Sequence, residues 1–258
     1  ENMAINKNFW KGKKVLVTGH TGFKGSWLSL WLQSLGAEVV GVSLDVPTTP
    51  SLYEQANVSE NMISLREDIR DVMAIRKIFQ DHLPEIVFHL AAQPLVRLSY
   101  REPVETYETN VMGTLHVLEG IRSVDSVRSA VMITTDKCYQ NKEWVWGYRE
   151  TDTLGGHDPY SSSKAAAELL ISSYRESYFP QDKYGEHKTA IASARAGNVV
   201  GGGDWADDRL IPDIIRAFQN NKEVFVRNPK STRPWQHVLE PLSGYLELSE
   251  QLYKEGYK

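Results

Sequence analysis

The 258-residue sequence has one cysteine and no long apolar run. Because Cys138 has no second cysteine to pair with, an internal disulfide is excluded, which fits a reducing compartment and predicts a cytoplasmic protein. No stretch of roughly 18 apolar residues occurs, so we expect no membrane span. The first residues, ENMAINKNFW, lack the apolar core of a signal peptide.

The sequence also lacks any concentration of charge of one sign. Lys and Arg number 29 against 33 Asp and Glu, and the basic residues are scattered without a polybasic block. This balance argues against a nucleic-acid surface, so we expect no nucleic acid as a partner. We also expect neither a membrane as a partner nor a metal. With 41% hydrophobic residues, the chain can bury a large core, as one domain with at most a smaller appendage.

Apolar segments typical of strands alternate with segments of helical spacing along most of the chain. This alternation predicts an α/β fold with a doubly wound, parallel sheet. Strands are expected at 13–19, 37–45, 61–69, 85–92, 128–136 and 188–197, and helices at 24–36, 71–83, 102–124 and 158–178.

The pattern weakens after residue 197. A loop rich in Gly and Asp at 198–210 precedes an expected helix at 211–221, a strand at 222–228 and a helix at 240–256. We interpret these segments as a smaller lobe that packs over the carboxyl edge of the sheet, where ligands of open α/β sheets bind.

Three glycines, Gly19, Gly22 and Gly25, mark the turn from the first expected strand to the first helix. Glycine permits a tight turn and close approach of a pyrophosphate, whose charge the free N–H groups at the helix start can hold. The spacing is G-x-x-G-x-x-G rather than G-x-G-x-x-G, and a turn that merely needs glycine is the alternative. The position on a first strand–helix turn favours a dinucleotide site.

Residues at the ends of the following strands extend this expected site. Asp45 ends the second strand, where an acidic residue can bind the adenosine ribose of NAD, although a solvated loop charge is the alternative. No arginine is expected next to it to receive a 2′-phosphate, which favours NAD over NADP. Asp68 and Ile69 are candidates for contact with adenine. Ala91 and Ala92 are small enough for the cofactor to lie flat, or are plain core residues.

The segment YSSSK places Tyr160 and Lys164 one turn apart on one helix face. A phenol titrates near pH ~10, and a nearby ammonium together with the positive nicotinamide is expected to lower that pKa. Such a tyrosine can take a proton from a sugar hydroxyl while hydride leaves for NAD. Thr135, at the end of the fifth strand, can hydrogen-bond the same hydroxyl. Tyr-x-x-x-Lys alone occurs often by chance, but its conjunction with the glycine-rich turn predicts this chemistry.

The motifs TGHTGFKG, HLAAQ, Thr109-Asn110 and YSSSK together resemble the extended short-chain dehydrogenase/reductase family over nearly the whole chain. The resemblance implies a Rossmann domain with bound NAD at 1–197, part of a nucleotide-sugar lobe at 198–258, and a homodimer or tetramer built through the two long helices. Extended members usually continue well beyond YKEGYK, so the resemblance implies a truncated lobe. The further cofactor contacts that it implies are Thr21, Phe23, Lys24, Leu90, Gln93, Thr109, Tyr160 and Lys164.

The stretch TTDKCYQ separates the activities within this family. Epimerases and simple oxidoreductases need only Thr, Tyr and Lys, whereas a 4,6-dehydratase must also protonate the departing 6-hydroxyl and remove the C-5 proton. Sugar-nucleotide dehydratases typically carry Asp-Glu after the threonine, whereas this chain carries Asp136-Lys137. Asp136-Lys137, together with the segments GHTGFKGSWL and AAQPLVRLSY, resembles the branch of the family that acts on CDP-glucose. The resemblance implies a lyase of deoxysugar and O-antigen biosynthesis.

Three alternatives stay open. An NAD-dependent epimerase is disfavoured by Asp136-Lys137, a dehydratase of another nucleotide sugar is not excluded from first principles, and a non-catalytic NAD-binding scaffold has no need of an activated phenol. Within the dehydratase hypothesis, Asp136 is the expected general acid. Lys137 is either a neutral base at C-5 or a cation that stabilises the enolate. A surface ion pair of the two is the remaining alternative.

The expected substrate site lies beyond these catalytic residues. Asn198 matches a family position at the sugar-nucleotide phosphates, and Arg209 and Arg233 supply cations for a diphosphate unless they are plain surface arginines. Leu210 and Val226 are candidates for a cytosine pocket, although Val226 also suits a core strand. The remaining candidates, placed over the sugar just after the fourth strand, are Gln93 and Arg97.

Overall fold

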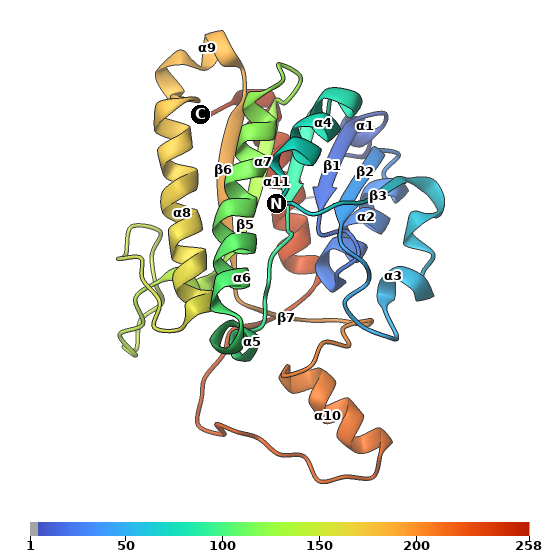
Figure 1. Cartoon of the computed structure of the whole chain (residues 1–258), viewed down its shortest axis with the longest axis vertical. Helices are drawn as coiled ribbons and strands as arrows, with labels where there is room; N and C mark the ends of the chain where they lie inside the picture. The colour runs from blue at the N-terminus through green and yellow to red at the C-terminus, as the bar shows by residue number, and fades with distance from the viewer. Residues whose placement is uncertain (1–4, 258) are drawn as a thin grey trace.

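In the computed structural model, which describes residues 5–257, six parallel strands form one sheet of order β3-β2-β1-β4-β5-β6 (Figure 1). The winding direction changes between β1 and β4, which leaves a crevice at the carboxyl ends of these strands. This order confirms the predicted doubly wound, Rossmann-type fold. The strands are β1 (Lys14–Thr18), β2 (Glu38–Ser43), β3 (Ile63–Arg66), β4 (Ile86–His89), β5 (Ser129–Thr135) and β6 (Ala190–Ala196).

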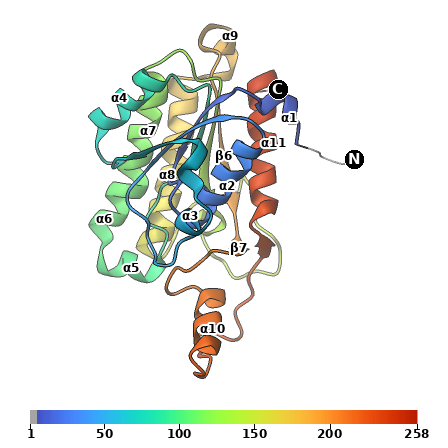
Figure 2. The same cartoon turned by 90° about the vertical axis from the view of Figure 1, so that its right-hand side faces the viewer.

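Helices cover both faces of the sheet, and each face buries its own apolar core (Figure 2). The central strands are therefore apolar along nearly their whole length: every residue of β4 and β5 is buried. The helices α4 (Val72–His82), α7 (Gly113–Arg122) and α8 (Pro159–Ser177) lie on one face, and α2 (Phe23–Ser34) and α11 (Leu239–Glu255) on the other.

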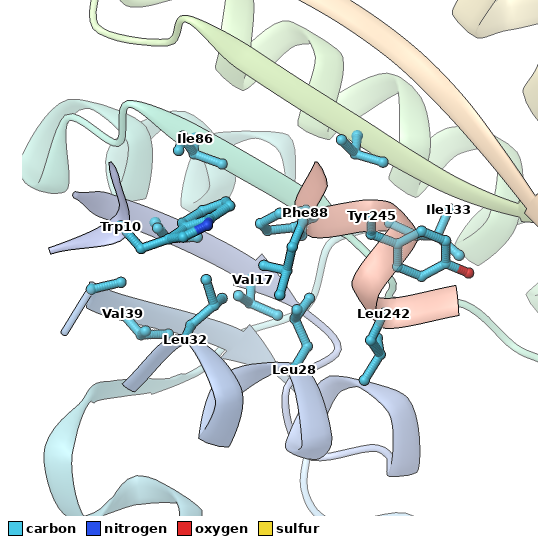
Figure 3. Packing of buried hydrophobic residues seen from close by; sticks show 14 of the residues in the cluster. Trp10, Val17, Leu28, Leu32, Val39, Ile86, Phe88, Ile133, Leu242 and Tyr245 are labelled. Atoms are coloured by element: carbon cyan, nitrogen blue, oxygen red, sulfur yellow. The ribbon is translucent and has the colours of Figure 1, made fainter. Parts of the chain in front are cut away.

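Helix α11 lies on the sheet and corrects the interpretation of residues 240–256 as part of the smaller lobe. Leu242, Tyr245, Leu246 and Leu252 join the core formed by β1, β4 and α2 (Figure 3). Positions i, i+3, i+4 and i+10 lie on one face of a helix and make one apolar stripe, which is stable only against an apolar surface. The division of the chain into domains at residue 197 stays a prediction.

The segment between β6 and α11 is the least regular part of the described chain. Two short parallel strands, β7 (Asn198–Val200) and β8 (Trp235–His237), pair there, and α10 (Leu210–Gln219) lies apart from the layered body (Figure 1). The expected strand at 222–228 is absent, because no described strand lies beside it to accept its hydrogen bonds. Its residue Phe225 is 84% exposed.

The expected long helix at 102–124 is continuous but changes character along its length. It begins as α6 (Pro103–Tyr107), widens into one π-helical turn at Glu108–Met112, and continues as α7. Such single π turns occur often at functional sites.

No helix within residues 5–257 is long and apolar enough to cross a membrane. The short elements that the sequence analysis did not predict are α1 (Lys7–Trp10), α3 (Leu52–Gln55), α5 (Val96–Arg101), α9 (Tyr184–His187) and 3-10 turns at 58–61, 136–138 and 181–183.

Candidate active site

The three glycines of the first turn differ in what surrounds them. Gly19 has a φ of +78°, and a Cβ there would lie 2.7 Å from the backbone nitrogen of Ala91. A Cβ on Gly25 would lie 2.0 Å from the carbonyl oxygen of Gly19. Both positions therefore need glycine for the protein's own packing. A Cβ on Gly22 would meet nothing closer than the Gly19 oxygen at 3.4 Å, so this glycine leaves room for another molecule.

Gly22 precedes α2, and no side chain within the described chain caps this helix. Its first N–H groups are therefore available for an anion, and the residues fit a dinucleotide diphosphate. Thr21 is buried and occupied within the protein, since its hydroxyl lies 2.7 Å from Ser43 Oγ and donates to the Leu44 carbonyl at 3.1 Å. Phe23 packs against the core beside α11.

Asp45 has an arginine beside it in space. Its carboxylate lies 3.4 Å from the Nε of Arg66, the last residue of β3, and its side chain is 95% exposed. The expectation that no arginine is near is therefore wrong, because parallel pairing of β2 with β3 brings together residues that are 21 positions apart in the sequence. An exposed carboxylate at this strand end still suits a ribose.

The two residues expected to contact adenine, Asp68 and Ile69, make contacts within the protein. Asp68 accepts hydrogen bonds from Arg70, with Nε and Nη2 at 2.8 and 2.7 Å from Oδ2. Burial of the Asp68 carboxyl raises its pKa, but the bonds from Arg70 outweigh this and hold the pKa below its usual value. Ile69 is 4% exposed and packs where a Cβ on Gly113 would collide with it. Ile69 is therefore a core residue at this point.

A buried chain of hydrogen bonds fixes the ends of β1 and β4. Thr18 Oγ1 accepts from the backbone nitrogens of Leu90 and Ala91 at 3.1 and 3.2 Å, so its single proton is donated to His89 Nδ1 at 2.7 Å. His89 Nε2 must then carry the ring proton and donate to Thr114 Oγ1 at 3.1 Å. Burial, together with the Lys164 charge, lowers the pKa of His89 to about 3, which keeps the ring neutral. Ala92 follows this fixed point and is half-buried.

Asn110, in the π turn, joins the end of β4 to the start of α8. Its Oδ1 accepts from Gln93 N at 2.8 Å, and its Nδ2 donates to Gln93 O at 3.1 Å and to Ser163 Oγ at 2.9 Å. The Gln93 side chain is itself occupied, by Thr106 at 2.8 Å and by the Leu95 nitrogen at 2.6 Å. Gln93 therefore shapes the site. Asn110, which the sequence indicated only as part of a motif, is a further site residue. Thr109 lies half-buried beside it.

Tyr160, Thr135 and Lys164 come together at the carboxyl end of β5, as expected. The Thr135 hydroxyl hydrogen-bonds the Tyr160 phenol. Burial raises the pKa of Tyr160 to about 12, although Thr135 and the charge of Arg209 act in the opposite direction. The expected lowering of this pKa is therefore not achieved by the protein alone. One reason is that the Lys164 ammonium donates to the Ile133 carbonyl at 3.2 Å, and burial lowers its own pKa to about 8.

Asp136 and Lys137 stand on the 3-10 turn that directly follows β5. Thr135 Oγ1 donates to Asp136 Oδ1 at 3.0 Å, so the carboxylate adjoins the oxidation residues. Lys137 Nζ lies 3.5 Å from Asp136 Oδ1 and 3.5 Å from Asn198 Oδ1. The side chains of Asp136 and Lys137 are 34% and 36% exposed, so neither is a freely solvated surface charge.

A second buried network, which the sequence analysis missed, holds this turn. Arg195 on β6 donates from Nε and Nη2 to the carboxylate of Glu168 on α8, at 3.0 and 2.8 Å. Its Nη1 donates to Tyr139 OH at 2.8 Å, immediately after the 3-10 turn. Thr134 and Ser193 also donate to Glu168. The network therefore ties β5, β6 and α8 to the backbone that carries Asp136 and Lys137.

The expected substrate residues are spread more widely. Arg209 pairs with Asp204 at 3.1 Å and acts electrostatically on Tyr160, so it belongs to the site. Arg97 pairs with Asp208 at 2.7 Å and is 65% exposed. Arg233 lines a cavity of about 1950 Å³ that Asp136 and Lys137 also line. Leu210 and Val226 are each 40% exposed.

In residues 5–257, no group of three or more His, Cys, Asp or Glu side chains could hold a metal ion.

The chain is similar to nucleotide-sugar enzymes of known name. A CDP-glucose 4,6-dehydratase from Salmonella typhimurium is 60% identical over 254 residues, which cover 98% of this chain and 71% of that protein. The chain spans a smaller share, 59%, of a human dTDP-D-glucose 4,6-dehydratase.

Two solved structures support the fold. An epimerase from Methanothermobacter thermautotrophicus matches with a TM-score of 0.80 and 25% identity, over 96% of this chain and 71% of that one. The protein MoeE5, solved in complex with UDP-glucose and NAD, matches with a TM-score of 0.76 and 25% identity, over 94% of this chain and 73% of that one. A family model described as GDP-mannose 4,6 dehydratase matches residues 16–257. The chain therefore belongs to the GDP-mannose 4,6 dehydratase family.

Proposed function

We propose that this chain is an NAD-dependent lyase that converts CDP-D-glucose to CDP-4-keto-6-deoxy-D-glucose. The observation that carries the proposal is the junction of two sets of residues at the end of β5. Thr135, Tyr160 and Lys164 suffice for oxidation of a hydroxyl, and Asp136 and Lys137 add the acid and the cation that an elimination needs. The 60% identity with a CDP-glucose 4,6-dehydratase supports the choice of base and sugar.

NAD suits the turn before α2, and MoeE5 with its bound NAD supports this choice. The uncapped N–H groups after Gly22 would hold the diphosphate, and Asp45 would accept hydrogen bonds from the adenosine ribose. When bound, NAD supplies a reversible acceptor for one hydride. Because the hydride is returned in each cycle, no external oxidant or reductant is consumed.

The residues then act in sequence. Tyr160 takes the proton of the 4-hydroxyl, with Thr135 holding the oxygen, while hydride leaves C-4 for NAD. The resulting ketone acidifies C-5, which releases its proton to solvent. Asp136, in its protonated form, donates a proton to the 6-hydroxyl, which departs as water and leaves a C-5/C-6 double bond conjugated to the ketone. Return of hydride to C-6 and of a proton to C-5 completes the product.

Lys137 acts as a cation in this scheme. Its Nζ lies 3.5 Å from each of two acceptors, Asp136 Oδ1 and Asn198 Oδ1, which hold it at the end of β5. A cation beside the developing enolate stabilises the charge that forms when C-5 loses its proton.

We further propose a homodimer in the cytoplasm. The outer face of α6 and the π turn exposes Val104 (69%), Tyr107 (38%) and Met112 (43%). Tyr107 also reaches α8 through Ser162 Oγ at 2.9 Å, so the two long helices present one continuous surface. Exposed apolar side chains gathered on one face favour contact with a second copy.

Isotope transfer tests the proposed reaction. Hydride leaves C-4 and returns to C-6 within one closed site, so CDP-glucose deuterated at C-4 should give product with deuterium at C-6, and the C-5 hydrogen should come from solvent. Product formation should need no added oxidant. Mass spectrometry and NMR of the product read both labels. Loss of the deuterium to solvent would contradict the proposal.

The variant Asp136→Asn separates elimination from oxidation. Water loss should slow by ~10²–10⁴, the usual contribution of a general acid, while the first hydride transfer is affected less. NADH should therefore accumulate on the variant and be visible by its absorbance. An unchanged rate in Asp136→Asn would remove this residue from the elimination.

A further inference from the structure

The 3-10 turn at 136–138, which carries the expected acid and the cation, is held at both of its ends. Before it, Thr135 is the last residue of β5 and pairs with β6. After it, the backbone of Tyr139 forms a bridge with Leu154. Cys138, in the turn itself, is fully buried. The backbone is therefore fixed on both sides of the two charged side chains that line the cavity.

The side chain of Tyr139 is fixed by a buried ion pair. Its hydroxyl oxygen accepts a hydrogen bond from Arg195 Nη1 at 2.8 Å, and Nε and Nη2 of the same arginine donate to Glu168. The side chains of Arg195 and Glu168 are 17% and 4% exposed. Burial raises the pKa of the Glu168 carboxyl, but hydrogen bonds from Arg195 and two hydroxyl groups outweigh this and hold the pKa below its usual value. The pair therefore stays charged at neutral pH, and Arg195 has a fixed place from which to hold the phenol.

Tyr139 adjoins the residues of elimination but not those of oxidation. Within residues 5–257, no side-chain hydrogen bond joins Tyr139 to Thr135, Tyr160 or Lys164, whereas its backbone directly follows the turn. Glu168 differs in this respect, because its charge acts against the lowering of the Lys164 pKa by burial. Tyr139 is therefore the member of the network through which the two steps can be separated.

We propose that Tyr139 is a positioning residue for the elimination of water, an inference that rests on the proposed function. By accepting the hydrogen bond from Arg195, Tyr139 holds the turn where Asp136 reaches the 6-hydroxyl, and it takes no part in the first hydride transfer. A misplacement of about 1 Å can cost ~10² in rate when a group must meet a reacting atom. Without its contact to Arg195, the turn is free to shift Asp136, while Thr135 stays fixed within β5.

The variant Tyr139→Phe tests this role, because it removes only the hydroxyl that accepts from Arg195. The ring can stay stacked on Tyr148, whose centre lies 5.0 Å away with an interplanar angle of 13°. Single turnovers of CDP-glucose with NAD⁺ are followed by NADH absorbance, which rises in the first hydride transfer and decays after water loss. The rise should stay within about twofold of wild type, and the decay should slow by ~10–10², as expected for a small misplacement of the acid.

Tyr148→Phe is the matched control, because it removes a hydroxyl from the other ring of the same stack. That hydroxyl accepts from Lys142 N at 2.7 Å and donates to Asn141 Oδ1 at 3.2 Å, so it lies outside the Arg195 network. Both the rise and the decay of NADH should match wild type in this variant. Equal slowing of the decay in Tyr139→Phe and Tyr148→Phe would overturn the proposal.

A double-mutant cycle with Asp136→Asn distinguishes positioning from a general loss of structure. If Tyr139 acts through Asp136, Tyr139→Phe should slow the decay by less than about twofold in the Asp136→Asn background. An undiminished effect in that background, or equal slowing of rise and decay in Tyr139→Phe, would contradict the positioning role. Wild-type decay in Tyr139→Phe would overturn this role alone, whereas wild-type decay in Asp136→Asn would overturn the proposed function as well.

Discussion

At the scale of single residues, Tyr160 shows how the protein and its cofactor share the activation of a base. Its pKa of about 12 in the protein alone makes the phenol a poor proton acceptor at neutral pH. The residues around it reduce the cost of the phenolate only in part, through the Thr135 hydrogen bond and the Arg209 charge. The positive ring of NAD⁺ is the remaining source of stabilisation for the anion.

We therefore expect binding of NAD⁺ to lower the pKa of Tyr160, because a positive ring stabilises the phenolate and the phenol then loses its proton at lower pH. Phenolate absorbance of wild type minus that of Tyr160→Phe, titrated with and without NAD⁺, measures the shift. Tyr160→Phe should bind NAD⁺ nearly as well as wild type and lose ~10²–10⁴ in turnover. Wild-type turnover in this variant would exclude Tyr160 as the base.

Residue types at strand ends could be predicted, but their partners could not. Thr135, Tyr160 and Lys164 were identified because a hydroxyl, a phenol and an amine in these positions suit one reaction. Asn110 and Glu168 were missed as site residues because their partners are distant in the sequence: Asn110 and Ser163 are 53 positions apart, and Glu168 and Arg195 are 27 positions apart. Only the fold brings such groups together. A useful signal was nonetheless present, namely single polar residues such as His89 within apolar strands.

At the scale of elements, the strands were predictable wherever both faces are covered. The segments Ile86–His89 and Ser129–Thr135 are mostly apolar, and all of their residues are buried under helices on both faces. The segment 222–228 also contains apolar residues typical of a strand, but no described strand lies beside it. A short segment does not itself determine whether a partner strand will be present. The apolar stripe of α11 was recognised as helical, but the sequence does not say which surface covers such a stripe.

The exposed face of α6 and the π turn carries a prediction of its own. Val104→Arg should convert the proposed homodimer into a monomer, because it places a charge where apolar side chains of two copies would meet. Met73→Arg, on α4, is the matched control, since Met73 is 68% exposed and lies on another helix. Sedimentation velocity of the three proteins measures the outcome. A wild-type monomer, or an equal effect of both variants, would contradict this interface.

At the scale of the whole molecule, the sheet is stable only when both of its faces are covered. The first face is completed by α4, α7 and α8, and the second by α2 together with α11. Helix α11 contributes Leu242 and Leu246, both 0% exposed, to the same cluster as Val17 and Phe88 (Figure 3). The stability of the site therefore depends on a helix that carries none of the predicted catalytic residues.

Leu246→Ala should lower the free energy of unfolding by about 2–5 kcal/mol, the usual cost of a cavity at a fully buried leucine. The control Gln251→Ala, at an exposed position of the same helix, should change it by less than about 0.5 kcal/mol. Urea unfolding followed by circular dichroism gives both values. A Leu246→Ala protein as stable as wild type would mean that α11 is not part of the cooperative unit.

The place of α11 in the chain has a consequence for biosynthesis. A ribosome delivers all six strands of the main sheet and the helices α2, α4, α7 and α8 before Leu239–Glu255 emerge. Until then Val17, Leu28 and Phe88 lack the cover that Leu242 and Leu246 provide, and a nascent chain exposes part of an apolar sheet face until α11 has been synthesised. During this interval the exposed apolar face favours aggregation and capture by chaperones. Lys24 Nζ, which donates to Tyr245 OH at 2.9 Å, also gains this partner only after α11 has been synthesised.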